Sequence, residues 1–351
     1  MTIQGIDHIE LHVGDLGNAI ARWQHFGFTA EIRSDDSALL RYGANRLLLT
    51  AGPAAREYIR RHGDGVATIA FRTDDVHAAF AGALAGGAEV IAAPAVSADG
   101  DGRTRTAIVS GFGDVTHLLI ERAADDTEAS DPPEAGDLFT ALDHVAVCLP
   151  PDQLDGTVRL YQNAFGLTEV FDERIEVNGQ AMVSKVVQNL ARTVTFTLIQ
   201  PDPDLAPGQI DQFLTAHGGA GVQHLALLTP DIARAIRTLA DRGVEFLSAP
   251  DGYYRALAAR LGPLALDVAT LRELHVLADR DQWGQLFQIF TRSAHDRSTF
   301  FVELIERQGA LTFGSGNIRA LYAALEDELP AMTPPAMTPP AMTLPAMTLP
   351  D

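Results

Sequence analysis

The sequence has 351 residues, with 26 Lys and Arg against 46 Asp and Glu, which gives a formal net charge of −20. Hydrophobic residues make up 46% of the chain, so a chain that is disordered throughout is excluded. At roughly 100 to 200 residues per domain, the length allows about two domains, each able to bury a core. The acidic balance, without a cluster of Lys and Arg, disfavours nucleic acid as a partner.

The composition also limits the compartment and the kind of metal site. No run of about 18 apolar residues is present, and the first residues lack a basic segment followed by an apolar one, so we expect no membrane span and no cleaved signal. We therefore expect a cytoplasmic protein. The single cysteine, Cys148, cannot form an intramolecular disulfide or a thiolate metal cage. Any metal must be held by histidine and carboxylate side chains.

Two stretches depart from a globular pattern. Residues 123–137 are acidic and contain Pro but almost no large apolar side chain, which predicts an exposed linker. From residue 330 the chain repeats Pro-Ala-Met-Thr, and Pro at that density predicts a disordered tail over 330–351. We therefore expect a first domain over 1–122 and a second over 138–329.

The two expected domains resemble each other in sequence. The segment DHIEL at Asp7 recurs as DHVAV at Asp143, and GVATIAF at Gly65 recurs as GVQHLAL at Gly221. An Ala-rich or amphipathic helical stretch follows the second segment in each domain. Each domain thus has the pattern of a strand, a helix and further strands, which indicates an internal repeat.

In chain order, short apolar runs predict strands over 9–13, 46–50, 106–113, 116–121, 183–188, 193–199, 285–290 and 299–306. The predicted helices cover 17–25, 74–86, 156–165, 231–242 and 316–328. Ser315 is a suitable N-cap for the last helix. The pattern predicts an α+β chain built from repeated βαβββ units, with sheets curved around a central cavity.

Three residues of the second domain have the chemistry of a metal site. His144, His224 and Glu303 each lie inside an apolar strand pattern, where alternation places them beside apolar residues on one face. Burying a carboxylate there is costly unless it is paired or ligates a cation. Each residue alone would more often be a packed core group, but their matching positions in repeated units favour a shared role. Two imidazoles and one carboxylate form the facial triad that suits non-heme Fe(II).

The first domain lacks most of this pattern. Thr68 aligns with His224, Leu118 aligns with Glu303, and only His8 is retained. Because one imidazole is no metal site, we expect the first domain to be structural or oligomeric. Three further histidines there are expected to be solvated or packed: His12, His62 and His117.

The second domain contains a series of sequence motifs in a fixed order: DHVAVC, PGQIDQFL, GVQHLAL, GVEFL, YYRAL, QLFQIF, FFVELIERQGA and FGSGNIRALY. In this order they resemble the vicinal oxygen chelate superfamily and, within it, the family of 4-hydroxyphenylpyruvate dioxygenase and 4-hydroxymandelate synthase. The resemblance covers residues 5–328. It implies a glyoxalase-like fold of two domains, with an open barrel around the metal in the second, and His144, His224 and Glu303 as ligands of Fe(II). It also implies that the substrate, 4-hydroxyphenylpyruvate, brings its own 2-oxo acid and reacts with O₂ with loss of CO₂.

The two members of this family form different products. Attack on the ring with side-chain migration gives homogentisate, whereas hydroxylation of the benzylic carbon gives 4-hydroxymandelate. Homogentisate-forming members usually carry PLNEP, where this chain has TLIQP with Thr197 and Ile199 in place of the first Pro and the Asn. Their last helix usually contains GNFKALF, where this chain has GNIRALY with Ile318 and Tyr322 in place of two Phe. These departures favour 4-hydroxymandelate and a role in making arylglycine precursors of antibiotics, with homogentisate as the alternative.

The resemblance also implies a substrate pocket and no catalytic residue beyond the metal ligands. The polar candidates are Ser184, Thr197, Gln209, Gln288 and Asn317, the last as a brace for a closing helix. The apolar candidates are Ile199, Phe290, Phe301, Phe313, Ile318 and Tyr322. Gln223 is expected to point to the opposite face, because it is the strand neighbour of His224.

Other readings of the same fold remain open at this point. One is a glyoxalase-like or ring-cleaving enzyme of the superfamily, which would need a further carboxylate ligand or an acid–base His and Tyr near the metal. Another is a small-molecule binding or resistance protein, which needs no metal. Family members are often dimers or tetramers, so the resemblance allows a homo-oligomer.

Overall fold

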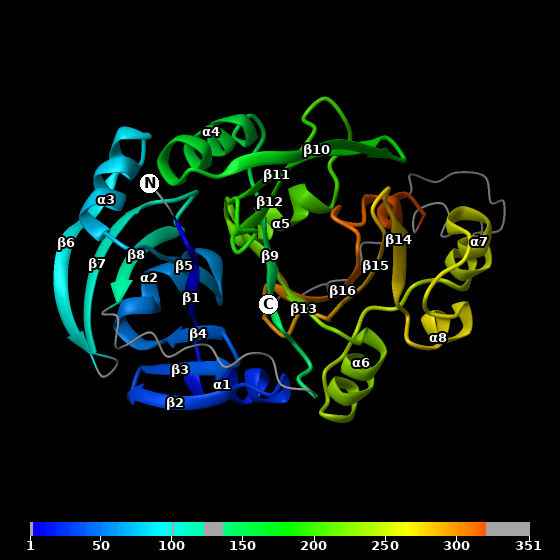
Figure 1. Cartoon of the computed structure of the whole chain (residues 1–351), viewed down its shortest axis with the longest axis horizontal. Coiled ribbons are helices and arrows are strands. Elements are labelled where there is room, and N and C mark those ends of the chain that lie inside the picture. Colours follow the sequence, from blue (N-terminus) through cyan, green and yellow to red (C-terminus); the bar gives the residue numbers. More distant parts are fainter. Residues whose placement is uncertain (1–2, 100–101, 123–135, 321–351) are drawn as a thin grey trace, which may run out of the picture.

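Two eight-stranded mixed sheets carry the fold (Figure 1). The computed structural model describes residues 3–99, 102–122 and 136–320. The first sheet has the strand order β2-β3-β4-β1-β5-β8-β7-β6 and the second the order β10-β11-β12-β9-β13-β16-β15-β14. The second order is the first with eight added to each number, so the predicted internal repeat and the α+β class are confirmed.

The first sheet consists of β1 (Gly5–His12), β2 (Thr29–Ser34), β3 (Ser37–Tyr42), β4 (Asn45–Thr50), β5 (Gly65–Arg72), β6 (Val90–Asp99), β7 (Gly102–Ser110) and β8 (Thr116–Arg122). The second consists of β9 (Ala141–Cys148), β10 (Thr168–Val177), β11 (Gln180–Gln188), β12 (Thr195–Pro201), β13 (Gly221–Leu228), β14 (Leu277–Arg280), β15 (Gln285–Phe290) and β16 (Phe301–Gln308). The helices are α1 (Leu16–His25), α2 (Gly52–His62), α3 (Val76–Ala85), α4 (Leu154–Phe165), α5 (Gln209–His217), α6 (Ile232–Asp241), α7 (Asp251–Leu261) and α8 (Val268–Glu273).

The sequence patterns found the central strands and missed several outer elements. Strands β2, β3, β6, β10 and β14 were not predicted. Most of β2 is exposed, and its apolar side chains are too few to signal a strand. Helices α2, α5, α7 and α8 were not predicted either. Pro53 sits in the first turn of α2, where a missing N–H costs nothing.

The predicted last helix begins where expected, with its N-cap shifted by one residue. Residues 315–320 are helical, so Ser315 is the first helical residue and Gly314 precedes it. The remainder of that helix, Tyr322, residues 123–135 of the linker and the 330–351 tail lie outside the described residues.

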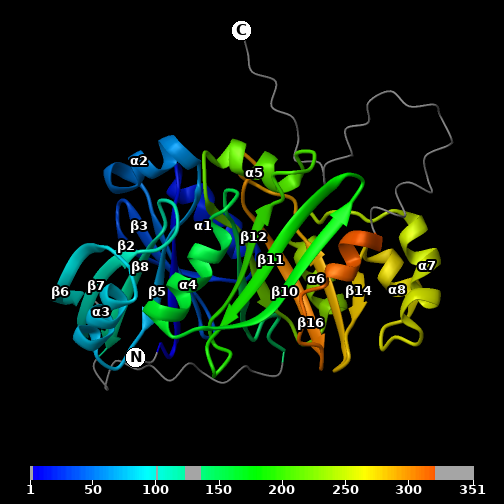
Figure 2. The ribbon, with the colours of Figure 1, turned by 90° about the horizontal axis from the view of Figure 1, so that it is seen from above.

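The two halves share one continuous hydrophobic core. Helices α3 and α4, from the two halves, pack against each other and lie side by side in Figure 2. An aromatic cluster with rings from both halves lies near them. His117 of β8 stacks on Phe71 at 4.5 Å between ring centroids and lies 3.0 Å from the hydroxyl of Tyr161 in the other half. Burial lowers the pKa of His117 to about 3, so the ring is neutral. His117 is thus a packed core group, as predicted.

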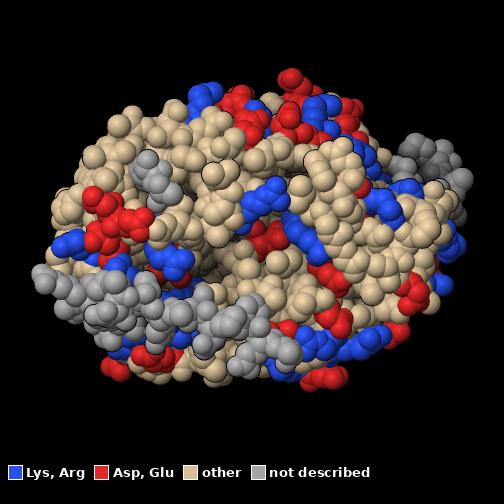
Figure 3. All heavy atoms as spheres, in the orientation of Figure 1, with Lys and Arg blue, Asp and Glu red and all other residues tan. Residues whose placement is uncertain are grey.

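His62 and His12 also pack against rings. His62 stacks on His217 of the second half at 4.5 Å, and His12 contacts the edge of Tyr58 at 5.3 Å. Within the described residues neither belongs to a cluster of metal-ligating groups. On the face shown in Figure 3, basic and acidic side chains are interspersed, and no extended basic surface is visible among the described residues. The described part of the chain contains no helix long and apolar enough to cross a bilayer.

A buried ion pair connects β1 and β8 of the first sheet. Asp7 lies 2.8 Å from Arg122, and both side chains are at most 9% exposed. Burial alone would raise the pKa of Asp7, but the hydrogen bonds and charges of Arg122 and His8 outweigh it and hold that pKa well below its usual range. A depressed carboxyl pKa stabilises the fold above the unfolded-state value of 3.8, and this contribution is lost as the pH falls further.

We therefore expect Asp7→Asn to lower the free energy of unfolding by about 3 kcal/mol at pH 7, because it removes the charge that the buried guanidinium of Arg122 contacts through two hydrogen bonds of 2.8 Å. Urea unfolding at pH 7 and at pH 3 measures this. At pH 3 the difference between wild type and variant should be smaller by about 1 kcal/mol, since part of the wild-type contribution is already lost. An equal difference at both pH values would contradict the assignment.

Candidate metal centre and substrate cavity

The three predicted ligands converge on one point in the second sheet. The Nε2 atoms of His144 and His224 lie 3.4 and 3.2 Å from the same oxygen, Oε2 of Glu303. All ligand atoms lie within 4.8 Å of one another, and all three residues are buried. They come from the adjacent strands β9, β13 and β16 at the centre of the sheet.

The strand register explains this convergence. In the parallel pairing of β13 with β16, Ala226 lies opposite Glu303, and in the antiparallel pairing of β13 with β9 the same Ala226 lies opposite His144. The small side chain of Ala226 leaves room between the two ligands. The first sheet has the same register, with Ala70 opposite Leu118 and opposite His8.

Two β-bulges orient the histidine rings. The ladder between β13 and β9 shifts once between Val222 and His224 and once between Ala226 and Leu227, opposite Asp143 and His144. Each bulge places the residue before a histidine beside that histidine's ring. His144 Nδ1 lies 2.8 Å from Asp143, and His224 Nδ1 lies 3.2 Å from Gln223 Oε1.

These contacts correct the expectation for Gln223. A regular strand would turn its side chain to the opposite face, but the bulge brings it to the side of His224, where it lines the same cavity. Both imidazoles thereby hold a proton on Nδ1 and present Nε2 to the common point, which is the arrangement that metal-ligating histidines have.

An arginine behind the site fixes the first of these partners. Arg307 contacts both oxygens of Asp143, at 2.7 and 2.8 Å, and also donates to the carbonyls of Ala310 and Thr312 at 3.2 and 2.7 Å. Neither Asp143 nor Arg307 was predicted as a site residue. The signal was present, since the aligned pair Asp7 and Arg122 occupies the same positions of the first repeat.

We expect Asp143→Asn to weaken Fe(II) binding by about 10- to 100-fold, because the amide no longer accepts the Nδ1–H of His144 as strongly and no longer neutralises Arg307. Anaerobic Fe(II) titration of the purified protein measures this. Asp7→Asn is the matched control, since it makes the same change at the equivalent position of the half without a triad. Equal loss of iron affinity in both variants would show a general effect on the fold.

The electrostatics of the triad favour a cation. Burial opposes the charged form of Glu303, but the two imidazoles outweigh it and lower its pKa to about 2, so the carboxylate is ionised. Burial also opposes a charged His144, yet Glu303 and Asp143 raise its pKa to about 9. Burial lowers the pKa of His224, and the charge of His144 lowers it further. A divalent cation would replace the proton that His144 otherwise holds, so the donor set fits a metal ion.

A cavity of about 340 Å³ opens directly onto the triad. Ten of the predicted pocket residues line it: Ser184, Thr197, Ile199, Gln209, Gln288, Phe290, Phe301, Phe313, Asn317 and Ile318. The eleventh, Tyr322, lies outside the described residues. The cavity is also lined by residues that were not predicted, among them Phe171, Ile175, Leu247, Pro250 and His275.

Aromatic rings surround the metal point. Phe301 stacks on His224 with 4.9 Å between centroids, and Phe313 meets the ring of His144 edge-on at 5.2 Å. Phe290 contacts Phe301 edge-on at 5.8 Å. These rings hold the imidazoles in place and make the near wall of the cavity apolar.

Three buried polar atoms of the cavity residues have no hydrogen-bond partner among the described residues: Thr197 Oγ1, Gln288 Oε1 and Asn317 Nδ2. Unpaired buried groups are costly unless a ligand or water satisfies them. The carbonyl of Asn317 accepts from the hydroxyl of Tyr253 at 2.6 Å and from Arg260 at 3.1 Å, so the residue does brace the last helix against α7. The cavity therefore offers polar groups to a ligand.

Gly314 allows the last helix to close over the cavity. Its φ is +74°, and a Cβ there would lie 1.8 Å from Oε1 of Gln288. The positive φ favours glycine, and a Cβ would also displace the end of the Gln288 side chain. The start of the last helix is thus held against β15 at the cavity wall.

Comparison with known proteins places this geometry in a family. Residues 1–132 match the model described as hydroxyphenylpyruvate dioxygenase, N-terminal, and residues 141–289 match the glyoxalase, bleomycin resistance protein and dioxygenase superfamily. The chain is 31% identical to 4-hydroxyphenylpyruvate dioxygenase of Aspergillus fumigatus, over 93% of this chain and 92% of the relative. The chain belongs to the 4-hydroxyphenylpyruvate dioxygenase family. The enzyme of Danio rerio is 34% identical over 78% of this chain and 74% of its own.

Solved structures agree with this membership. A triple variant of 4-hydroxymandelate synthase from Streptomyces coelicolor superposes with a TM-score of 0.81 at 41% identity, covering 93% of this chain and 99% of that one. A Mn(II)-bound glyoxalase from Novosphingobium aromaticivorans, at 12% identity and a TM-score of 0.57, shares the fold alone and covers 87% of this chain and 82% of its own. This member of the 4-hydroxyphenylpyruvate dioxygenase family is therefore an oxygenase with a glyoxalase-like fold.

Proposed function

We propose that this chain is an Fe(II)-dependent dioxygenase that converts 4-hydroxyphenylpyruvate and O₂ into 4-hydroxymandelate and CO₂. Both atoms of O₂ are used, one in the carboxylate that forms when CO₂ leaves and one in the new benzylic hydroxyl. The 2-oxo acid that is oxidised is part of the substrate, so no separate 2-oxo acid co-substrate is needed.

The triad supports the iron assignment. His144, His224 and Glu303 supply three ligands to one side of a common point, and the cavity occupies the other side. Bound there, Fe(II) supplies the electrons that activate O₂ and a Lewis-acidic position for the 2-oxo acid. Fe(II) and one carboxylate leave one positive charge, which a substrate carboxylate neutralises.

The chain's own residues position the substrate and keep the site dry. The unpaired atoms of Thr197, Gln288 and Asn317 provide hydrogen bonds inside the cavity. Phe290, Phe301 and the start of the last helix limit the entry of water beside the metal point. No acid–base residue is required, because the proposed reaction moves no proton to or from a side chain.

The part of the cavity wall that β12 contributes supports 4-hydroxymandelate as the product. Thr197 and Ile199 both line the cavity, and they pair with Ala146 and Cys148 of β9, the strand that holds His144. Ile318 lines it from the last helix. Where homogentisate-forming members usually have Asn, the apolar Ile199 offers no hydrogen bond to the ring. An unanchored ring is free to turn its benzylic carbon toward the metal. The likeness to 4-hydroxymandelate synthase at 41% identity supports the same choice.

Product identification tests the proposal directly. The iron-loaded protein is incubated with 4-hydroxyphenylpyruvate and O₂, and the products are separated by chromatography beside both standards. We expect 4-hydroxymandelate as the main product, with one O₂ consumed for each CO₂ released. Homogentisate as the main product would refute the choice of product, and an iron-loaded protein that consumes no O₂ would favour a binding protein.

Homogentisate formation is the second candidate, because the curated relatives at 31% and 34% identity carry the name 4-hydroxyphenylpyruvate dioxygenase. The same assay decides between the two products. Within the described residues the metal cluster has three members and one carboxylate, which disfavours a glyoxalase-type site with two carboxylates.

A further inference from the structure

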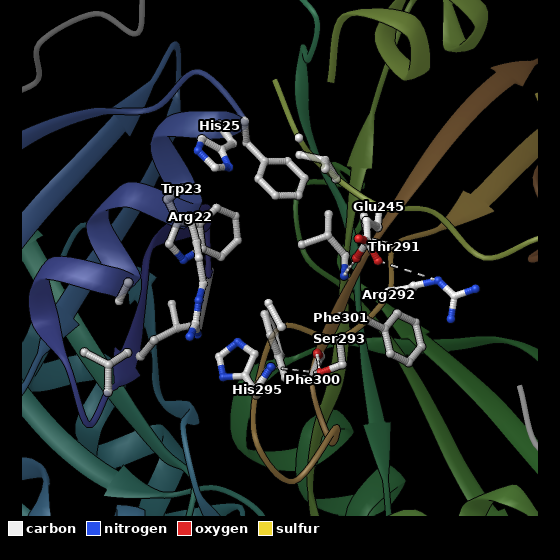
Figure 4. Close-up of a pocket in the computed structure, with 18 residues that line it drawn as sticks. Arg22, Trp23, His25, Glu245, Thr291, Arg292, Ser293, His295, Phe300 and Phe301 are labelled. Atoms are coloured by element: carbon white, nitrogen blue, oxygen red, sulfur yellow. Dashed lines mark hydrogen bonds and ion pairs between the residues drawn. The ribbon is translucent and has the colours of Figure 1, made fainter. Parts of the chain in front are cut away.

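A second cavity, of about 310 Å³, lies between the two halves of the molecule. Figure 4 shows Arg22, Trp23 and His25 on one side, from α1 of the first half, and the segment after β15, with Arg292 and His295, on the other. We call it the inter-half cavity. Its volume is close to that of the metal cavity. Both lie within the range of small-molecule sites, whose lower limit is about 300 Å³.

The inter-half cavity has a positive balance in a strongly acidic chain. Arg292 is paired with Glu245 at 3.8 Å between Nε and Oε2, so these two charges offset each other. Arg22 is half-buried and forms no hydrogen bond or ion pair with another described side chain. Burial, aided by Arg22 and opposed by Asp64 and Asp296, lowers the pKa of His295 to about 4, so that ring is neutral. One unpaired guanidinium therefore faces the cavity, and an anion would neutralise it.

Aromatic rings form much of the remaining wall. Trp23 and Phe26 lie 5.5 Å apart on the side of α1, and Phe300 contacts the ring of His295 edge-on at 5.3 Å on the other side. Phe301 completes the wall. Rings at these positions favour a planar aromatic group by offset or edge-on contact.

We propose that the inter-half cavity is a second ligand site that binds a small aryl carboxylate. The carboxylate pairs with the guanidinium of Arg22, and the ring packs against Trp23 and Phe300. The proposal rests on the chemistry of this cavity and holds whichever product the metal centre forms.

The two cavities share a wall. Arg292 and Phe301 line both of them, and Phe301 is the ring that stacks on His224. The segment after α6 does the same, with residues 243–245 on the inter-half cavity and residues 247–250 on the metal cavity. The proposed ligand therefore lies one side chain from the metal centre, and it is of the same chemical class as the compounds processed there.

Tryptophan fluorescence tests the proposal without turnover. The chain contains two Trp, Trp23 in the cavity wall and Trp283, which is 56% exposed in the turn after β14. In the full-length, metal-free Trp283→Phe protein, Trp23 is the sole reporter. Titration with 4-hydroxyphenylacetate, which lacks the 2-oxo group, should change its emission in a saturable way. The uncharged 4-hydroxyphenylacetamide should bind at least about tenfold more weakly, because it cannot pair with Arg22.

Two variants in that background locate the ligand. Arg22→Gln should raise the Kd for 4-hydroxyphenylacetate at least about tenfold, whereas Arg56→Gln, the same change at an exposed position of α2, should leave it unchanged. Ala294→Phe, at an exposed position of the cavity rim, should also weaken binding by filling the space. A change in emission that does not saturate, or equal Kd values for the Arg22→Gln and Arg56→Gln proteins, would overturn the proposal. None of these readouts depends on turnover, so they stand apart from the test of the product.

Discussion

Replacing the single carboxylate of the triad is expected to abolish both metal binding and oxygen consumption. In the Glu303→Ala protein only the two imidazoles remain as ligands. The net charge of the buried metal and its ligands would then rise from +1 to +2, which burial opposes. The loss of iron affinity should exceed the roughly 10- to 100-fold that changes behind the ligands cost. Metal analysis of the purified protein and an oxygen electrode with 4-hydroxyphenylpyruvate measure the two effects.

The fold should survive this change. Without a cation, the contacts of Glu303 with His144 and His224 only compensate the cost of burying its carboxylate. Removing the carboxylate removes this cost together with the contacts. Thermal unfolding of the metal-free proteins checks this. Glu306→Gln on the same strand is the matched control, because Glu306 accepts from the backbone N–H of Ile232 at 2.9 Å and should keep iron when changed. Normal oxygen uptake by the Glu303→Ala protein would remove Glu303 from the ligand set.

Restoring an amide to the cavity wall is expected to redirect the reaction. The Ile199→Asn change places a hydrogen-bonding group on β12, in the wall of the cavity that adjoins the triad. An amide that anchors the ring should bring the ring carbon toward the metal and raise the fraction of homogentisate at least about tenfold, which corresponds to 1.4 kcal/mol between the two outcomes. Chromatography of products at equal substrate turnover measures the ratio.

A second asparagine variant separates position from polarity. Ile175, on β10, is buried and lines the same cavity, so Ile175→Asn introduces an equal amide elsewhere in the wall. We expect it to slow turnover without changing the product ratio. If both variants shift the ratio equally, the location of the amide on β12 is not what selects the product.

The triad could be predicted because strand alternation places His144, His224 and Glu303 each on one face of an apolar strand. The contrast with the first half, where Thr68 and Leu118 align with two of the three, marked them as a set. The structure brings all three side chains together, along with ten residues that line the adjoining cavity. Local periodicity was sufficient here, because central strands buried on both faces carry strong apolar patterns.

The bulges and the surface elements could not be predicted in this way. The place of Gln223 depends on one extra residue in the pairing of β13 with β9, which no single-strand pattern contains. Helices α7 and α8 are inserted between α6 and β14 and have no counterpart in the described part of the first half, so the internal repeat could not predict them. The inter-half cavity depends on how α1 meets a loop more than 260 residues further along the chain, which is a property of tertiary packing.

The first half retains the same two irregularities in its ladder, although Thr68 and Leu118 stand where ligands would be. The ion pair of Asp7 with Arg122 is also present there, as is His8, the residue that corresponds to His144. The backbone shape that orients the imidazoles is therefore also present in the half without the ligand set, so it does not depend on coordination. We therefore expect a metal ion to bind to this scaffold and to leave it without refolding of the chain.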